Sequence, residues 1–261
     1  MLVTTLTANH IRLYYETLGQ GQALVFIHGL GSSTRDWESQ IPAFARDYQV
    51  IAFDLRGHGQ SDKPAGPYSM KMFAADLADL LVGLGITSAH IVGISLGGAV
   101  ALQFALDDAA LVKTLTVVNS GPSLGGTLEQ RRQEIERRVG VVQQYGMRVM
   151  GQTLAPNLFP APEQAALRET FVERWAQNDP AAYIEATRSM QDWDVTDQLG
   201  TIHCPTLVIA ADQDYTPVAS KEAYVKLLPH AELAVIANAH HAVPIERPQE
   251  FNAVLARFLT K

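Results

Sequence analysis

Ser95 lies where a strand-like apolar run meets a helix-like stretch, residues 89–94 before it and residues 99–106 after it. Gly93 and Gly97 flank the serine. A sharp turn from strand to helix needs such small residues, because the two backbones approach closely there. The pattern therefore predicts a hydroxyl exposed at the end of a strand, in position for nucleophilic chemistry.

The same spacing, Gly-x-Ser-x-Gly, occurs a second time around Ser123. The motif alone is weak, because chance produces it in roughly a tenth of chains of this length. Ser123 lies five residues beyond Val118, the last apolar residue of its strand-like run, and it follows a proline. We expect Ser123 to lie in a turn, and Ser95 to be the nucleophile.

A serine hydroxyl attacks a carbonyl only when a base removes its proton and N–H donors receive the oxyanion. The expected donors are the backbone N–H groups of Leu30 and Leu96, the latter at a helix start whose dipole favours negative charge. Leu30 belongs to the glycine-rich stretch 28–31, which by itself also fits an ordinary turn. The base is expected on the loop after the last apolar run, where both His240 and His241 qualify.

Short apolar runs must position these residues, because each candidate follows the end of one of them. Continuous apolarity, rather than alternation, is typical of strands that are covered on both faces. The sequence therefore predicts a mainly parallel sheet in an α/β fold. The runs are residues 23–29, 49–54, 89–95, 114–120, 206–212 and 231–237.

Helical patterns separate the apolar runs. Residues 73–84 carry apolar side chains at helical spacing, with Ser69 as the expected N-cap and Gly85 as the expected C-cap. The first residues alternate instead around a turn at Ala8-Asn9, which predicts an antiparallel hairpin. The sheet is therefore expected to be mixed at one edge.

From residue 124 to residue 200 the strand pattern gives way to helix signals. Asp179 followed by proline, for example, is typical of a helix start. We expect a core of residues 1–123 and 201–261 and a helical insertion, residues 124–200, packed onto it.

Composition excludes several classes of function. The net charge of −7, without clusters of lysine or arginine, argues against nucleic-acid and anionic-membrane partners. The first residues lack the pattern of a signal peptide, and no apolar run approaches the ~18 residues of a membrane span. A cytoplasmic protein is expected. The sequence shows neither metal-ligand spacing nor a dinucleotide-binding glycine motif, so no metal and no cofactor are expected. It does not indicate the oligomeric state.

Three motifs, residues 28–31, 53–61 and 93–98, resemble the opening motifs of the α/β-hydrolase superfamily. The similarity covers nearly the whole chain and weakens across 124–200, where that family inserts a variable helical cap. The resemblance implies an α/β-hydrolase fold, a mixed and mainly parallel sheet flanked by helices. It also implies a catalytic triad in the chain order Ser, Asp, His.

The acid of the triad is assigned by the family pattern of an acid three residues before a proline, which selects Asp214. Asp212 is the competitor and is expected to brace the same loop. Some family members hold the acid after the preceding strand, but this chain has Asn119 there, which cannot balance the charge of an imidazolium.

The base is assigned by the family spacing to a downstream Glu-x-Pro. That spacing matches His241, with Glu246 and Pro248 beyond it, while His240 stands where glycine is more common. The resemblance thus implies the triad Ser95, Asp214 and His241.

The function expected from this resemblance is a serine carboxylesterase acting on a small-molecule ester or lactone. The stretches 53–67 and 93–98 also resemble 3-oxoadipate enol-lactonases, so a lactone or carbon–carbon bond hydrolase is an alternative. A perhydrolase or acyltransferase and a ligand receptor that keeps the triad are the others. Apolar residues of the insertion are expected to shape the substrate pocket, namely Met147, Met150, Leu158, Phe159, Trp175, Met190 and Trp193.

Overall fold

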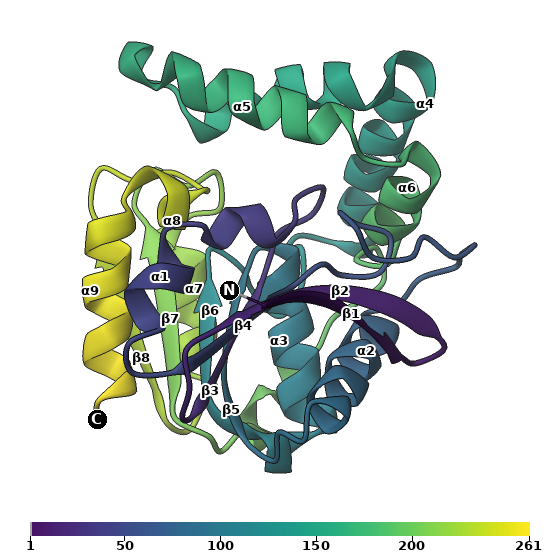
Figure 1. Ribbon diagram of the computed structural model, residues 1–261. Helices are drawn as coiled ribbons and strands as arrows, with labels where there is room; N and C mark the ends of the chain where they lie inside the picture. The colour runs from purple at the N-terminus through teal and green to yellow at the C-terminus, as the bar shows by residue number, and fades with distance from the viewer. Residues whose placement is uncertain (1) are drawn as a thin grey trace.

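A single sheet forms the centre of the computed structural model, which describes residues 2–261. Its eight strands follow the order β1-β2-β4-β3-β5-β6-β7-β8. The pairs β1–β2 and β2–β4 are antiparallel and all other neighbours are parallel (Figure 1). The predicted α/β class, with a sheet mixed at one edge, is confirmed. The strands are β1 (Leu2–Ala8), β2 (Ile11–Leu18), β3 (Ala23–Ile27), β4 (Gln49–Phe53), β5 (Ala89–Ile94), β6 (Val112–Val118), β7 (Thr206–Ala211) and β8 (Ala231–Ile236).

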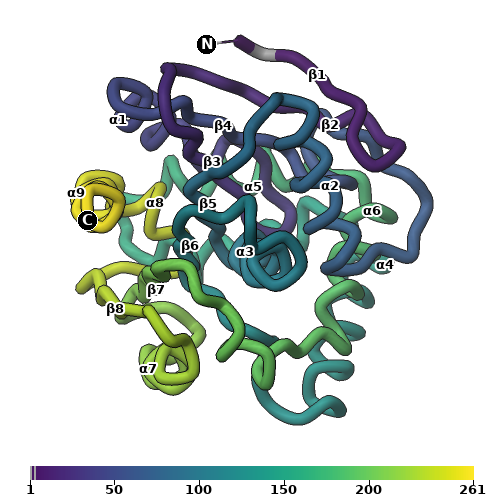
Figure 2. Tube along the Cα trace, turned by 90° about the horizontal axis from the view of Figure 1, so that it is seen from below, coloured from purple at the N-terminus to yellow at the C-terminus, as the bar shows by residue number. Residues whose placement is uncertain are grey.

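Helices cover both faces of the sheet, which explains the continuous apolar runs. Along β3, Val25 and Ile27 pack toward α2 and α3, whereas Leu24 and Phe26 pack toward α1 and α9. Figure 2 shows α1 and α9 on one side of the strands and α2 and α3 on the other. The helices of this part are α1 (Gln40–Phe44), α2 (Met70–Gly83), α3 (Leu96–Asp107), α7 (Val218–Val225), α8 (Val243–Glu246) and α9 (Pro248–Leu259).

The caps of α2 follow the sequence closely. Ser69 accepts a hydrogen bond from the N–H of Met72, as expected of an N-cap. The C-cap is Leu84, and Gly85 follows it with a φ of 70°, in the left-handed region where glycine commonly ends a helix.

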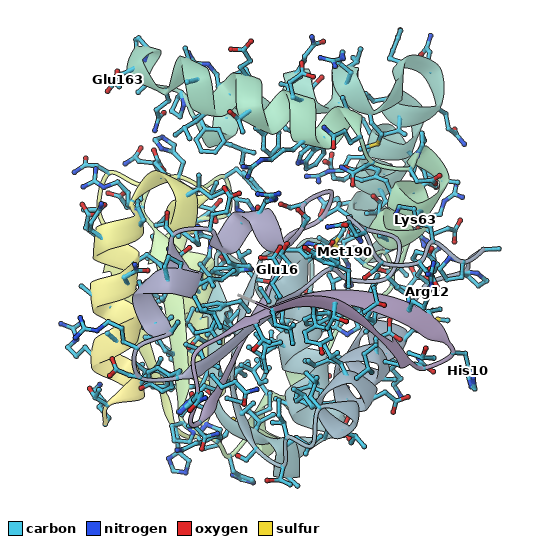
Figure 3. The ribbon with its side chains drawn as sticks, in the orientation of Figure 1. His10, Arg12, Glu16, Lys63, Glu163 and Met190 are labelled. Atoms are coloured by element: carbon cyan, nitrogen blue, oxygen red, sulfur yellow. The ribbon has the colours of Figure 1, made fainter. Side chains whose placement is uncertain are left out.

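The hairpin of β1 and β2 turns one residue later than predicted. Ala8 pairs with Ile11, so the two turn residues are Asn9 and His10, with φ values of 45° and 65°. Two positive φ values are what a tight two-residue hairpin turn requires. His10 points away from the rest of the molecule (Figure 3).

Residues 124–200 are mainly helical, and in Figure 1 their helices run along the top and down the right side of the molecule. Asp179 caps the third of them by accepting a hydrogen bond from the N–H of Ala182 at 2.8 Å. The long first helix is kinked at Gly146, where φ is 78°. We call residues 124–200 the helical segment, and its separation as a cap from a core stays a prediction. Its helices are α4 (Leu128–Leu158), α5 (Ala165–Ala176) and α6 (Pro180–Arg188).

None of the helices described between residues 2 and 261 is both long enough and apolar enough to span a membrane.

Candidate active site

Ser95 occupies a strained turn between β5 and α3. Its φ of 53° and ψ of −118° are unusual for a residue that is not glycine. The flanking glycines permit this turn, because a Cβ at Gly93 would lie 2.1 Å from the carbonyl oxygen of Gly97. A Cβ at Gly97 would lie 2.2 Å from the carbonyl oxygen of Ile27. The backbone thus holds the Ser95 side chain at the carboxyl end of the sheet.

His241 and Asp214 form a hydrogen-bonded pair at the same end of the sheet. His241 follows β8 and Asp214 follows β7, and the distance from His241 Nδ1 to Asp214 Oδ1 is 2.9 Å. Burial alone would raise the pKa of Asp214, but hydrogen bonding to His241 and its charge, with hydrogen bonds from Thr216 and Lys221, lower it to about 2. The ionised carboxylate accepts the Nδ1 proton, so Nε2 of His241 is free to accept another.

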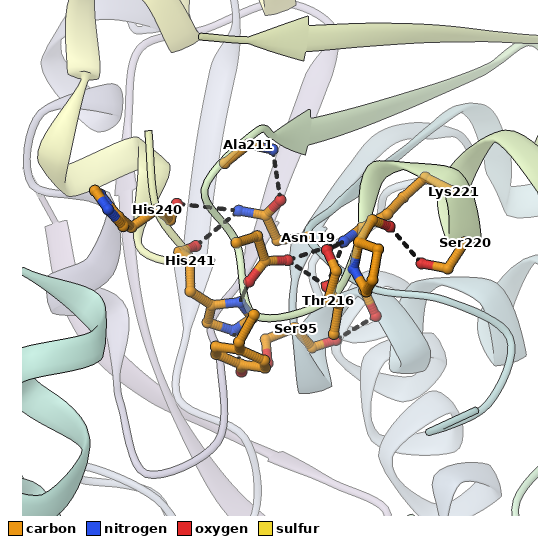
Figure 4. A network of polar contacts seen from close by, with 12 residues as sticks. Ser95, Asn119, Ala211, Thr216, Ser220, Lys221, His240 and His241 are labelled. Atoms are coloured by element: carbon orange, nitrogen blue, oxygen red, sulfur yellow. Dashed lines mark hydrogen bonds and ion pairs between the residues drawn. The ribbon is translucent and has the colours of Figure 1, made fainter. Parts of the chain in front are cut away.

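Lys221 and Thr216 bind the second oxygen of Asp214. Lys221 Nζ donates to Asp214 Oδ2 at 2.9 Å, and the Thr216 hydroxyl donates to the same oxygen. Figure 4 shows His241, Thr216 and Lys221 in one network of polar contacts. Sequence reasoning missed Lys221, although a signal was present: it lies on the same helical face as Val218 and Tyr224.

Tyr215, on the same loop as Asp214, contacts His241, and no sequence pattern pointed to it. Its hydroxyl lies 2.8 Å from His241 Nε2, and the two rings are stacked with centroids 4.3 Å apart. Burial raises the pKa of the phenol, so the hydroxyl is protonated at neutral pH and donates to Nε2. The residue as a whole is 54% exposed, whereas its hydroxyl end is enclosed against His241.

The two competing candidates, Asp212 and Ser123, make other contacts. Asp212 is exposed and accepts the N–H of Ala239 at 3.2 Å, which braces the loop. Ser123 forms an isolated bridge with Asp194 and accepts the N–H of Gly125 at 3.2 Å, as expected of a turn. Neither residue contacts His241 within residues 2–261.

His240 binds Glu246, which gives this unusual histidine a definite structural position. Its Nδ1 lies 2.8 Å from Glu246 Oε1, and its backbone N–H donates to Glu246 Oε2 at 2.6 Å. Gln164 of the helical segment donates to Glu246 Oε1 at 2.8 Å. Glu246 therefore joins the loop that carries His240 and His241 to the helical segment.

Asn119, at the position that lacks an acid, instead binds the loop that carries His241. Its Nδ2 donates to the carbonyl oxygen of His241 at 2.9 Å, and its Oδ1 accepts the N–H of Ala211 at 2.8 Å. This amide connects the ends of β6 and β7 to the loop that carries the base (Figure 4).

The glycine-rich loop lies against Ser95. A Cβ at Gly29 would lie 3.5 Å from the Cβ of Ser95. The N–H of Gly29 donates to Asp36 Oδ2 at 3.2 Å, and the Ser32 hydroxyl donates to the other oxygen. Burial raises the pKa of Asp36 to about 6, a rise that these hydrogen bonds oppose only in part. The position of Leu30 next in this loop is consistent with its predicted role, which stays a prediction together with that of Leu96.

The loop after β4, which carries the second family motif, braces the glycine-rich loop. Asp54 accepts the N–H of Thr34 at 2.8 Å and the N–H of Gln60 at 2.7 Å. The N–H of Leu55 donates to His28 Nε2 at 3.0 Å. Through these contacts the second motif supports the glycine-rich loop, which in turn lies against Ser95.

A pocket above Ser95 and His241 is mostly apolar. Of the seven pocket residues expected from the sequence, only Leu158 and Trp175 line it. Its apolar lining consists of Leu30, Ile94, Leu154, Leu158, Phe171, Trp175, Ala242, Pro244 and Ile245. The prediction was wrong for the other five residues, which pack elsewhere. They are Met147, Met150, Phe159, Met190 and Trp193.

Polar groups enter the same pocket at a few points. They are Ser32, Asp36, Ser95, Arg138, Tyr215 and His241. Among the residues that the structure describes, no three His, Cys, Asp or Glu side chains are grouped to hold a metal ion.

Comparison with known proteins places the chain in a family. Residues 24–254 match the profile of the alpha/beta hydrolase family. The chain is 33% identical over 264 residues to 3-oxoadipate enol-lactonase 2 of Acinetobacter baylyi, covering 97% of each chain.

Two solved structures extend the comparison. A thermophilic esterase from Thermogutta terrifontis with bound malate superposes with a TM-score of 0.91 at 25% identity, covering 100% of this chain and 98% of that one. Est816, described as an N-acyl homoserine lactone degrading enzyme, superposes with a TM-score of 0.85 at 29% identity, covering 98% and 100%. The chain therefore belongs to the alpha/beta hydrolase family, in its enol-lactonase-like branch, and the predicted fold is confirmed.

Proposed function

We propose that this hydrolase cleaves carboxylic esters with small or medium acyl chains through an acyl-enzyme on Ser95. One observation carries the proposal: a buried, ionised acid binds Nδ1 of His241, and His241 and the strained Ser95 border the same mostly apolar pocket. A fixed carboxylate holds the imidazole in the tautomer whose Nε2 can accept the serine proton. The arrangement supplies the parts that acyl transfer to serine requires.

In the first half-reaction, Ser95 Oγ attacks the ester carbonyl carbon while His241 Nε2 takes the hydroxyl proton. The carbonyl electrons move to oxygen, and the N–H groups of Leu30 and Leu96 receive that oxyanion. The intermediate collapses when the carbon–oxygen bond to the alcohol breaks, and the imidazolium returns its proton to the leaving oxygen.

In the second half-reaction, water replaces the alcohol. His241 removes a proton from water, the hydroxide attacks the acyl carbon, and the oxyanion forms again at the same donors. The bond to Ser95 Oγ then breaks and the imidazolium reprotonates the serine. The products are the carboxylic acid and the starting enzyme, so the cycle needs no cofactor.

A substrate panel tests the proposal. Initial rates on p-nitrophenyl esters of increasing acyl length are measured beside a set of lactones and of diketones. Rates that peak at short or medium acyl chains support the ester proposal, because the apolar pocket binds the chain. Turnover of diketones alone contradicts it, and so does the absence of any turnover.

A lactone is the second candidate substrate, and Arg138 favours it. This guanidinium, on α4, lines the pocket above Ser95 and donates from Nε to Glu134 at 2.8 Å, while its terminal nitrogens carry four further N–H donors. Such a cation suits a lactone that carries a carboxylate, and the similar enol-lactonase of Acinetobacter baylyi acts on a lactone by its name. A kcat/KM at least tenfold higher for acidic lactones than for neutral lactones and simple esters would favour this candidate.

The acid provides the first prediction, the change Asp214→Asn. We expect turnover to fall by about 10⁴, because an amide no longer fixes the tautomer or balances the imidazolium. Asp212→Asn is the matched control and should cost far less, since Asp212 only braces the loop. Rates of ester hydrolysis give the comparison.

The Asp214→Asn variant also leaves the buried Lys221 ammonium without its carboxylate, so its melting temperature should fall. Rates are therefore measured well below the melting temperature of each variant. If the two variants lose activity equally, or Asp212→Asn loses more, Asp214 is not the acid.

Tyr215 gives the second prediction, because its hydroxyl occupies the nitrogen that must receive the Ser95 proton. That hydroxyl has to move aside before Ser95 can react. We expect Tyr215→Phe to change turnover by less than about threefold. We also expect it to lower KM, because the variant lacks the hydrogen bond to His241, worth about 1 kcal/mol, that must break when substrate binds. Steady-state kinetics on one ester measure both constants. If turnover instead drops by roughly two orders of magnitude, the phenol takes part in proton transfer.

A further inference from the structure

Lys221 is fully enclosed, although a lysine is rarely buried without a partner because its charge is costly to remove from water. Its Nζ donates to Asp214 Oδ2 at 2.9 Å, to the carbonyl oxygen of Thr216 at 2.5 Å and to the Thr216 hydroxyl. An ammonium has three N–H donors, so all of them are used within the loop that carries the acid. The cation is therefore a fixed neighbour of the Asp214–His241 pair.

This cation changes the charge balance of the pair. The lone charge of a triad carboxylate ordinarily stabilises the imidazolium that forms beside it. Here Asp214 shares its charge between His241 on Oδ1 and Lys221 on Oδ2, and both the acid and the lysine side chain are at most 1% exposed. A second positive charge on His241 thus has to form beside an existing one, with little water to screen them.

We propose that Lys221 is a positioning residue of this site: its buried ammonium fixes Asp214 and offsets the negative charge that Asp214 presents to an imidazolium on His241. The inference rests on the proposed function, because it requires His241 to be the base. It adds a residue outside the triad, on α7, that sets the pH range of the reaction.

Other charged and titratable groups face the same imidazole. Asp36, before the first helix, attracts an imidazolium, and Arg138 on α4 lines the same pocket and opposes one. Tyr215 is neutral because burial raises the pKa of its phenol. On the chain next to the base, His240 is paired with Glu246. Since burial raises the pKa of Asp36 to about 6, this carboxyl titrates in the range of interest and needs its own control.

The test is the pH dependence of kcat/KM on a short-chain p-nitrophenyl ester for three variants. Lys221→Met removes charge and donors, Lys221→Gln removes the charge but keeps an N–H donor, and Lys226→Met removes an exposed charge near the end of α7. We expect the acid limb to move to higher pH by about one unit in both Lys221 variants, because two charges a few ångströms apart interact by this order in a protein interior. Lys226→Met should leave the limb in place. Repeating the profiles with Asp36→Asn in the background removes the titration of that carboxyl.

The outcomes separate the parts of the inference. An unmoved limb in folded Lys221→Gln overturns the charge effect, whether or not Lys221→Met folds, and melting temperatures report folding. A limb that moves to lower pH contradicts it as well. The proposed function fails differently: ester turnover that survives Ser95→Ala or His241→Ala would refute the mechanism whatever the Lys221 profiles show.

Discussion

Replacement of Ser95 by alanine is expected to abolish ester hydrolysis, with turnover lower by on the order of 10⁶. The variant lacks the hydroxyl that the strained turn presents to the pocket, so no acyl-enzyme can form. The pocket and the proposed oxyanion donors remain in this variant, and we expect them to sustain only a small residual rate. The measurement is the turnover rate on one ester, with circular dichroism to show that the fold is intact.

Ser123→Ala is the matched control, because Ser123 has the same flanking glycines and a different place in the fold. Its hydroxyl accepts the N–H of Gly125, in the turn before the helical segment. We expect this variant to keep nearly full activity. An inactive Ser123→Ala beside an active Ser95→Ala would reverse the assignment of the nucleophile.

The sheet was predictable because its parallel strands β3, β5 and β7 are buried along their whole length. Continuous apolar runs such as 206–212 became strands within one or two residues of the predicted ends. The hairpin turn was misplaced by one residue, since Asn9 and His10 both adopt positive φ and histidine carries no strong turn signal.

The site was predictable to the extent that its residues follow strand ends. Ser95, Asp214 and His241 are far apart in the sequence, but each follows a parallel strand. The carboxyl ends of these strands lie at the same end of the sheet, which brings the three residues together. Contacts between side chains of different loops at that end of the sheet produce no local pattern in the sequence. The stacking of Tyr215 on His241 depends on the direction of one loop, and a sequence does not show this direction.

The pocket was the least predictable part. Apolar residues at helical spacing in the helical segment can line the pocket or can pack in the hydrophobic core. Periodicity does not distinguish these two positions. Met147 and Met150 proved to be core, while Leu154 and Phe171 reach the pocket. The kink of α4 at Gly146 resets the helical face, which no periodic pattern across residues 128–158 anticipates.

The neighbouring histidines give the second large effect, because only one of them reaches the acid. His241→Ala should eliminate turnover, lowering it by on the order of 10⁶, since no other imidazole contacts Asp214 among residues 2–261. His240→Gly should leave an active enzyme. Its imidazole binds Glu246, and glycine retains the backbone N–H that donates to the same carboxylate.

A modest effect of His240→Gly on KM is still expected, because Glu246 also binds Gln164 of the helical segment, which covers the pocket. Loss of the imidazole contact loosens that connection without moving the base, which Asn119 holds by its carbonyl oxygen. Steady-state kinetics of both variants on one short-chain ester give the measurement, with Gln164→Ala as the control that breaks the connection from the other side. An active His241→Ala together with an inactive, folded His240→Gly would assign the base to His240, and the hydrogen bond to Asp214 would then be structural only.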